Sequence, residues 1–153
     1  MTTRKILIEP DPILRKKSSP LEKVDDQTRK LMKDMLETMY KAPGIGLAAT
    51  QVGILKRIIV IDISKNEEKK TPLFLVNPEI IFRSKNTSVY EEGCLSLPEI
   101  RINVERFDTI IYSYVDENFD KCTKEFSGML ATVIQHENDH LDGKLITDYA
   151  TPT

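Results

Sequence analysis

The chain has few of the features that mark secreted, membrane-spanning or strongly basic proteins. It contains only two cysteines, Cys94 and Cys122, whose separation matches no paired-cysteine pattern; we therefore expect no disulfide framework, and a reducing cytoplasm as its location. No run of apolar residues approaches the roughly 18 that a transmembrane helix requires. The N-terminus, MTTRKILIEPDP, reaches charge and proline too early for a signal peptide. A net charge of −2 argues against a protein that binds nucleic acid through bulk positive charge.

The rest of the composition is that of an ordinary globular protein, with 40% apolar and 30% charged residues. A length of 153 residues suits one domain with one core, and no internal repeat or linker divides the chain. We therefore predict a single domain over residues 1–153.

The order of the predicted elements favours an α+β fold. Apolar residues recur at helical spacing between residues 26 and 41, and again from about Gly128 to Leu141, before Gly143 ends the second helix. Strands are predicted at 57–63, on either side of Asn77-Pro78, at least twice within 87–118, at 121–127 as an edge strand, and at 145–150. Because the connections between consecutive strands are short, we predict mostly antiparallel sheets packed around the second helix, with one N-terminal helix.

Histidine is also scarce, and the only two histidines stand four residues apart in QHENDHLDG. On an α-helix, positions i and i+4 share one face, so His136 and His140 could bind one metal ion together. Glu137 follows the first histidine and would lie beside that metal, where it could take or give a proton. This H-E-x-x-H arrangement is typical of zinc-type hydrolases. The alternative is a surface helix that carries two histidines by chance.

The shortage of histidine limits the choice of a third ligand. A catalytic zinc-type site usually has three protein ligands and one open position. A third histidine does not exist, and no glutamate follows Gly143, so the ligand is sought upstream. Cys94 in EEGCLSLP is favoured, because a thiolate is a strong ligand and Gly93 allows a close backbone approach. Cys122, among the charges of KCTKEF, is the rival, and Cys94 could instead be a buried apolar cysteine.

A third motif, GIGLAATQVG at residues 44–53, matches the dinucleotide fingerprint only superficially, because no strand precedes it. Two interpretations stay open. The small residues could leave the backbone free to pair with an extended ligand, with the Gln51 amide donating to an oxyanion. The segment could equally be a tight turn packed under the sheet.

Together, GIGLAATQ, EGCLSLP and QHENDHLDG, in this order, resemble peptide deformylase, the enzyme that removes the formyl group from the N-terminal methionine of new bacterial-type proteins. The resemblance extends to PDPILRKKS, VNPEI and LITDYATP. It implies a metal-dependent hydrolase that acts on N-formyl-methionyl nascent peptides and releases formate.

The resemblance also implies roles for individual residues. Cys94, His136 and His140 correspond to the metal ligands, and Glu137 to the general base and acid. Gln51 and the backbone N–H of Leu95 correspond to the oxyanion hole. Residues that would face the substrate, including the methionine pocket that Leu95 also lines, are Ile45, Gly46, Gly93, Arg101, Thr132 and Val133.

The implied cofactor is one divalent metal ion, ferrous iron in cells, with zinc, nickel or cobalt able to take its place. Because metal-ligating histidines normally donate their other N–H to a partner, Glu92 is a candidate acceptor. Asp139 is expected to pair with Arg106 and fix a strand to the helix. The chain departs from the family pattern at Asn138, where we expect an effect on packing, and at Thr132, which is more polar than the usual pocket residue.

The resemblance is to a compact form without the long C-terminal helix found in many members. Any contact with the ribosome would then be made without that helix, and neither a membrane nor direct nucleic-acid binding is expected. Two other functions compete with deformylation. An H-E-x-x-H endopeptidase would hydrolyse internal peptide bonds. A non-catalytic metal-binding module would have a closed four-ligand site, for which Cys122 is the only second thiol.

Overall fold

A computed structural model of the chain describes residues 3–64 and 69–149. Within these residues the chain forms two α-helices, seven strands and three short 3-10 helices. The α-helices are α1 (Asp26–Lys41) and α2 (Gly128–Leu141). The strands are β1 (Gly46–Ala48), β2 (Ile58–Ile61), β3 (Leu73–Arg83), β4 (Thr87–Cys94), β5 (Leu97–Phe107), β6 (Thr109–Val115) and β7 (Lys121–Ser127). The 3-10 helices are η1 (Pro12–Arg15), η2 (Ala49–Val52) and η3 (Ile146–Tyr149).

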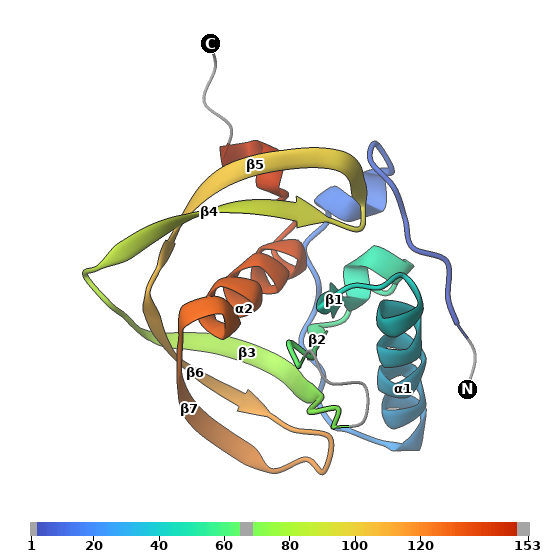
Figure 1. The fold of residues 1–153 in the computed structure, drawn as a ribbon. Coiled ribbons are helices and arrows are strands. Elements are labelled where there is room, and N and C mark those ends of the chain that lie inside the picture. The colour runs from blue at the N-terminus through green and yellow to red at the C-terminus, as the bar shows by residue number, and fades with distance from the viewer. Residues whose placement is uncertain (1–2, 65–68, 150–153) are drawn as a thin grey trace.

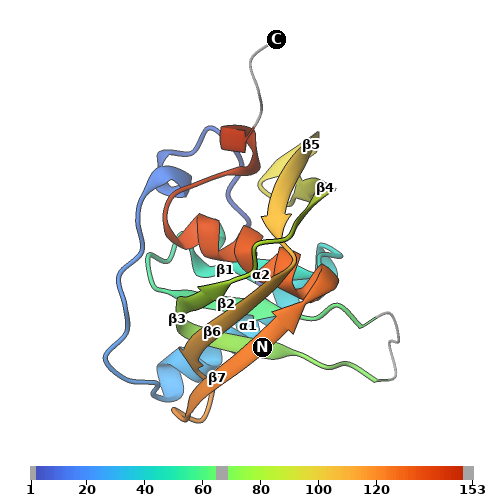
Figure 2. The same ribbon diagram turned by 90° about the vertical axis from the view of Figure 1, so that its left-hand side faces the viewer.

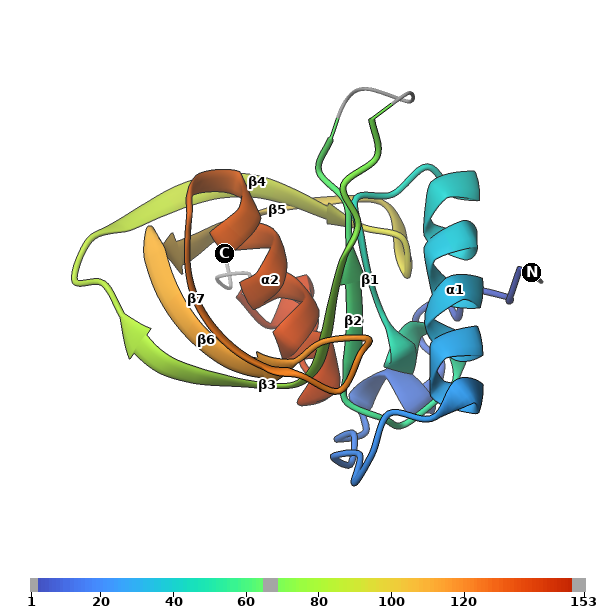
Figure 3. The ribbon, with the colours of Figure 1, turned by 90° about the horizontal axis from the view of Figure 1, so that it is seen from below.

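Every strand pairing is antiparallel, which confirms the predicted α+β class. One sheet has the strand order β1-β2-β3-β6-β7, and β4 and β5 form a separate two-stranded sheet. Helix α2 lies in the middle, with the curved β3, β6 and β7 on one side and the β4-β5 hairpin on the other (Figures 1 and 2). Helix α1 packs beside β1 and β2, away from α2 (Figure 3). The edge position of β7 is as predicted.

Strand β2 shows how the sequence produces these layers. Its four residues are all buried, and they alternate between two apolar clusters. Ile59 and Ile61 face the cluster formed with α2, whereas Ile58 and Val60 face the cluster formed with α1. A strand covered on both faces needs apolar residues at every position, which explains the unbroken run IIVI.

Both helices begin and end where the sequence predicts. The side chain of Asp25 caps α1 by accepting a hydrogen bond from the backbone N–H of Thr28 at 2.9 Å. Beyond the end of α2, Gly143 adopts a φ of +77° and lies against the backbone of Arg15. A side chain there would meet that backbone, so only glycine suits the position. Neither helix in the described part of the chain combines the length and the apolar character needed to cross a membrane.

The prediction of two short strands around Asn77-Pro78 is wrong. Residues 73–83 form one strand, β3, whose register against β6 shifts between Val76 and Glu79. Asn77 sits at the shift with a φ of +52°, and its side chain binds the backbone N–H and C=O of Leu21 at 2.8 and 2.7 Å. The irregularity absorbs the proline without ending the strand.

The prediction of a last strand at 145–150 is also wrong, because residues 146–149 form the 3-10 helix η3; residue 150 lies outside the described residues. The Asp148 carboxylate accepts a hydrogen bond from the backbone N–H of Leu145 at 3.1 Å and forms an ion pair with Arg15 at 2.7 Å. These contacts hold the segment as a turn against the N-terminal arm.

Candidate metal centre

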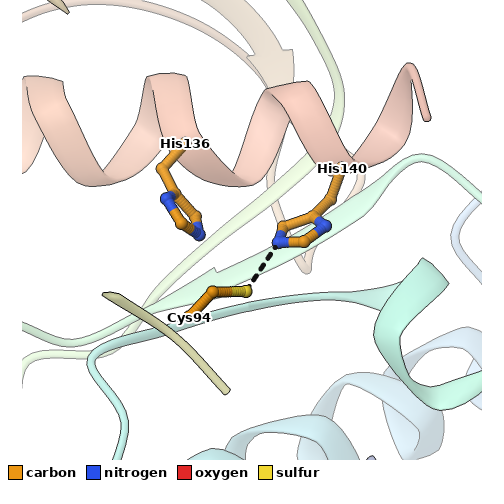
Figure 4. Close-up of side chains that lie close together, drawn as sticks. All are labelled: Cys94, His136 and His140. Carbon is orange, nitrogen blue, oxygen red and sulfur yellow. Dashed lines mark hydrogen bonds between the residues drawn. The ribbon is translucent and has the colours of Figure 1, made fainter. Parts of the chain in front are cut away.

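The three predicted metal ligands come together at one point, although they belong to two elements. His136 and His140 project from the same side of α2 toward Cys94, the last residue of β4 (Figure 4). Their ligand atoms all lie within 4.8 Å of one another, and Cys94 Sγ is 3.2 Å from His140 Nε2. The rival cysteine, Cys122, lies in β7 and contacts Asp116 through its sulfur at 3.7 Å.

The chemistry of this cluster fits a divalent metal ion. One thiolate and two imidazoles suit a borderline-soft cation and leave room for an open position. Burial disfavours a charge on His136, but Glu137, Cys94 and Glu92 outweigh burial and raise the pKa of His136 to about 10. The same negative surroundings favour a metal cation, which would replace the proton on the imidazole. Burial and the neighbouring His136 lower the pKa of His140, which keeps that imidazole neutral and able to bind a metal.

An ion-pair network holds the ring of His136. Its Nδ1 lies 2.9 Å from Glu92 Oε1, and both carboxylate oxygens of Glu92 accept hydrogen bonds from Arg106 at 2.9 Å. Arg106 also donates to Asp139 at 2.6 Å, so it connects β4 and β5 to α2. Although burial opposes ionisation of Glu92, the hydrogen bonds from Arg106 and His136 keep the pKa of Glu92 below its ordinary value. His140 differs, since its Nδ1 has no partner among the described residues.

The network makes a testable prediction for Glu92. Glu92→Gln would leave Arg106 with one anionic partner and His136 with a weaker acceptor, so we expect metal affinity to fall about 10–100-fold. Because a buried ion pair is broken, the free energy of unfolding should fall by about 3–5 kcal/mol. Chelator competition and urea unfolding measure the two effects. Glu105→Gln, on an exposed position of β5, is the control, and equal values for both variants would contradict the role of Glu92.

Glu137 lies beside the ligand atoms. Its Oε2 is 4.0 Å from His136 Nε2, and its Oε1 is buried without a partner among the described residues. Burial raises the pKa of Glu137 to about 7, a value suited to moving protons at neutral pH. Gly46 of β1 faces this carboxylate: a Cβ on Gly46 would come within 2.6 Å of Glu137 Oε2 and 2.9 Å of Val133 Cγ1. The absence of a side chain at Gly46 therefore allows the backbone of β1 to lie close to the Glu137 carboxylate.

The glycine segment combines features of both open interpretations. Gly46–Ala48 forms β1, an edge strand, and η2 then makes a tight turn. The C=O of Ile45 accepts a hydrogen bond from the backbone N–H of Asp62, the residue that follows β2, at 2.9 Å. Since peptide groups alternate in direction along a strand, those of Gly46 point toward the free edge.

The side chain of Gln51 is fixed next to Cys94, one of the three candidate metal ligands. Gln51 is buried, and its Oε1 accepts a hydrogen bond from the backbone N–H of Ala48 at 3.0 Å. Its Nε2 donates to Ser96 Oγ at 3.1 Å and lies 3.7 Å from Cys94 Sγ. A side-chain N–H donor therefore stands beside Cys94.

A cavity of about 540 Å³ lies beside this cluster. All the predicted substrate-facing residues contribute to its walls, together with Gln51, Glu92, Cys94, Leu95, His136 and Glu137. Arg106 and Asp139 do not line the cavity; Arg106 binds Glu92, which does, and also binds Asp139. Sequence reasoning missed Tyr90 and Met129, which also line the cavity. Met129 could have been found, because it precedes Thr132 and Val133 by three and four positions on the same helix face.

Comparison with known proteins gives a consistent result. The model of the polypeptide deformylase family matches residues 3–153. A peptide deformylase of Pelagibacter ubique is 52% identical over 149 residues, which cover 97% of this chain and 87% of the relative. The crystal structure of the Thermotoga maritima peptide deformylase superposes with a TM-score of 0.92 at 41% identity, covering 99% of this chain and 100% of the other. That of Synechococcus elongatus, in complex with actinonin, superposes with a TM-score of 0.95 at 40% identity, covering 99% and 82%.

Proposed function

We propose roles for the residues of this site on the premise that the chain belongs to the polypeptide deformylase family. The protein is a hydrolase that removes the formyl group from the N-terminal formyl-methionine of nascent polypeptides and releases formate. The roles rest mainly on one observation: a thiol and two imidazoles meet beside the buried carboxylate of Glu137, at the wall of a cavity.

The free edge of β1 would bind the substrate. An extended formyl-methionyl peptide can pair with the N–H and C=O of Gly46, in the manner of an added strand. This pairing would direct the methionine side chain toward Ile45, Leu95, Thr132 and Val133, which line the cavity. Arg101, on the same wall, can bind a backbone carbonyl further along the peptide.

Cys94, His136 and His140 would hold the metal. A divalent cation held there supplies a Lewis acid and lowers the pKa of water, so that a nucleophile is available near neutral pH. Gln51 Nε2 and the Leu95 N–H would donate to the oxygen of the formyl group as it gains negative charge; elsewhere, one such donor contributes about 10²–10³-fold to the rate. Glu137 would accept the proton of the attacking water and deliver it to the leaving amine, acting as base and then as acid.

Ferrous iron is the metal that we propose for the enzyme in cells. Zinc, nickel or cobalt can use the same three ligands, because this ligand set does not select among them. Since the nascent chains on which the enzyme acts emerge in the cytoplasm, we propose that it works there.

The thiolate ligand gives a prediction that distinguishes iron from nickel. Cys94 lines the cavity and is only partly buried, and a thiolate beside ferrous iron is open to oxidation. We expect the iron form to lose activity in air several times faster than the nickel form. Residual activity at timed intervals measures this, with both forms kept under nitrogen as the control. Equal lifetimes in air would contradict the prediction.

The decisive activity assay compares two substrates of one sequence and also measures cleavage of their internal peptide bonds. An N-formyl-methionyl peptide should release formate, whereas the N-acetyl-methionyl peptide should react far more slowly, and no internal bond should be cleaved. Cleavage of internal bonds would indicate the H-E-x-x-H endopeptidase instead. Metal binding without any hydrolysis would indicate a non-catalytic module.

A further inference from the structure

The 3-10 helix η3 brings one aromatic residue, Tyr149, against the network behind the metal centre. The Tyr149 hydroxyl donates to Asp139 Oδ2 at 2.6 Å. The guanidinium carbon of Arg106 lies 4.8 Å from the centre of the Tyr149 ring, and Arg106 Nη1 is 3.3 Å from its hydroxyl. Tyr149 therefore contacts both members of the ion pair that connects β5 to α2.

Helix η3 is held firmly enough to keep Tyr149 in this position. Its first residue, Ile146, and the preceding Leu145 are buried in an apolar cluster with Leu14 of η1. On its outer side, both oxygens of Asp148 accept hydrogen bonds from Arg15, at 2.7 and 2.8 Å. The apolar contacts of Leu145 and Ile146 and the ion pair between Arg15 and Asp148 thus hold η3 in place.

A continuous set of hydrogen bonds runs from Tyr149 to a metal ligand. Tyr149 and Arg106 share the same oxygen of Asp139, and the remaining donors of Arg106 fix the two oxygens of Glu92. Glu92 Oε1 then binds His136 Nδ1. A guanidinium is planar and rigid, so its orientation at Asp139 determines where Glu92 is held.

We propose that Tyr149 is a positioning residue of the deformylase reaction, which holds Arg106 and Asp139 so that Glu92 fixes the ring of His136 toward the metal. The proposal rests on the metal-ligand role of His136 given above. Two contacts contribute: the hydroxyl orients Asp139, and the ring covers the face of Arg106 and keeps water from it.

The test measures metal retention as well as turnover. In Tyr149→Phe the ring stays and the donor is lost, whereas Tyr149→Ala removes both. We expect zinc to be lost to a chelator about 3–10-fold faster from Tyr149→Phe, less than the 10–100-fold effect of a direct ligand partner, and faster again from Tyr149→Ala. For formyl-methionyl peptide hydrolysis, kcat should fall with KM unchanged, because the substrate does not contact Tyr149. Wild-type rates of zinc loss for Tyr149→Phe would overturn the proposal even if Tyr149→Ala failed to fold.

A matched control is available in the same chain. The Tyr40 hydroxyl donates to Asp62 Oδ2 at 2.5 Å, and Tyr40 belongs to α1, on the far side of the sheet from α2 (Figure 3). Tyr40→Phe thus removes the same type of hydrogen bond without touching the network. Tyr40→Phe should retain zinc like the wild type. Equal zinc loss from Tyr40→Phe and Tyr149→Phe would show that the loss results from general destabilisation, and would overturn the proposal.

A double-mutant cycle separates action through Asp139 from any other route. If Tyr149 acts through this carboxylate, Asp139→Asn combined with Tyr149→Phe should lose zinc no faster than Asp139→Asn alone. Additive effects would overturn the proposed route. If the wild type released no formate, but zinc loss still increased from the wild type to Tyr149→Phe and then to Tyr149→Ala, only the assigned function would be contradicted.

Discussion

Replacing Glu137 with glutamine is expected to lower kcat for formate release by about 10³–10⁴-fold, the upper part of the range for a general acid and base. Glutamine has the shape of glutamate but cannot accept and return a proton. In this protein the carboxylate is buried and has an oxygen free of other partners among the described residues. The cavity wall has one other buried carboxylate among the described residues, Glu92, and it is already bound to Arg106 and His136.

The Glu137→Gln experiment requires that the metal and the substrate site survive. Metal content should stay at one ion per chain, and KM should change little, since the proposed role places Glu137 at the reacting atoms rather than at the peptide backbone. Glu137→Asp is the companion variant: it keeps the carboxylate but withdraws it by one methylene, so its turnover should lie between those of Glu137→Gln and the wild type. Turnover of metal-loaded Glu137→Gln within tenfold of the wild type would remove Glu137 from the proton transfers.

Replacing Cys94 with serine should have the largest effect on the metal itself. A hydroxyl is a poor substitute for a thiolate with a borderline-soft cation, so we expect metal affinity and activity to fall at least about 100-fold. Metal analysis of protein dialysed against a weak chelator measures the first, and formate release the second. We expect metal affinity and activity to be lost together. The fold should survive, because Cys94 is the last residue of β4.

The chain offers an internal control for Cys94. Cys122 is also partly buried, and both cysteines are unpaired thiols, but Cys122 lies in the edge strand β7. Cys122→Ser should keep the metal and the activity of the wild type. A protein that loses its metal on replacement of Cys122 but not Cys94 would show that the wrong cysteine is assigned.

The local features of the fold and of the site could be predicted from the sequence. The limits of α1 and α2 follow from apolar spacing, a capping aspartate and glycine, all within one helix length. The geometry of His136, Glu137 and His140 follows from the helical repeat alone. Cys94 lies 46 residues before His140, and spacing could not place it beside the histidines. The sequence favours it because a third histidine and a glutamate after Gly143 are absent, a thiolate is a strong ligand, and Gly93 stands beside it.

The parts that failed depend on contacts between distant residues. The segment LITDY contains three residue types that favour strands, isoleucine, threonine and tyrosine. Asp148 nevertheless binds Arg15, 133 positions away, and the segment forms η3. No local pattern contains that contact, and Tyr149 was missed for the same reason. Similarly, Pro78 suggested the end of a strand, whereas the hydrogen bonds of Asn77 to Leu21 support a bulge within β3.

X-ray absorption of the zinc-loaded protein tests the central claim most directly, because it counts the sulfur and nitrogen ligands of the metal. We expect one sulfur at about 2.3 Å and two imidazole nitrogens at about 2.0–2.1 Å, with a light atom in the remaining position. Cys94→Ser should remove the sulfur signal, and Cys122→Ser should leave it intact. Two sulfur ligands, or none, would contradict the assignment of Cys94, His136 and His140 as an open catalytic site.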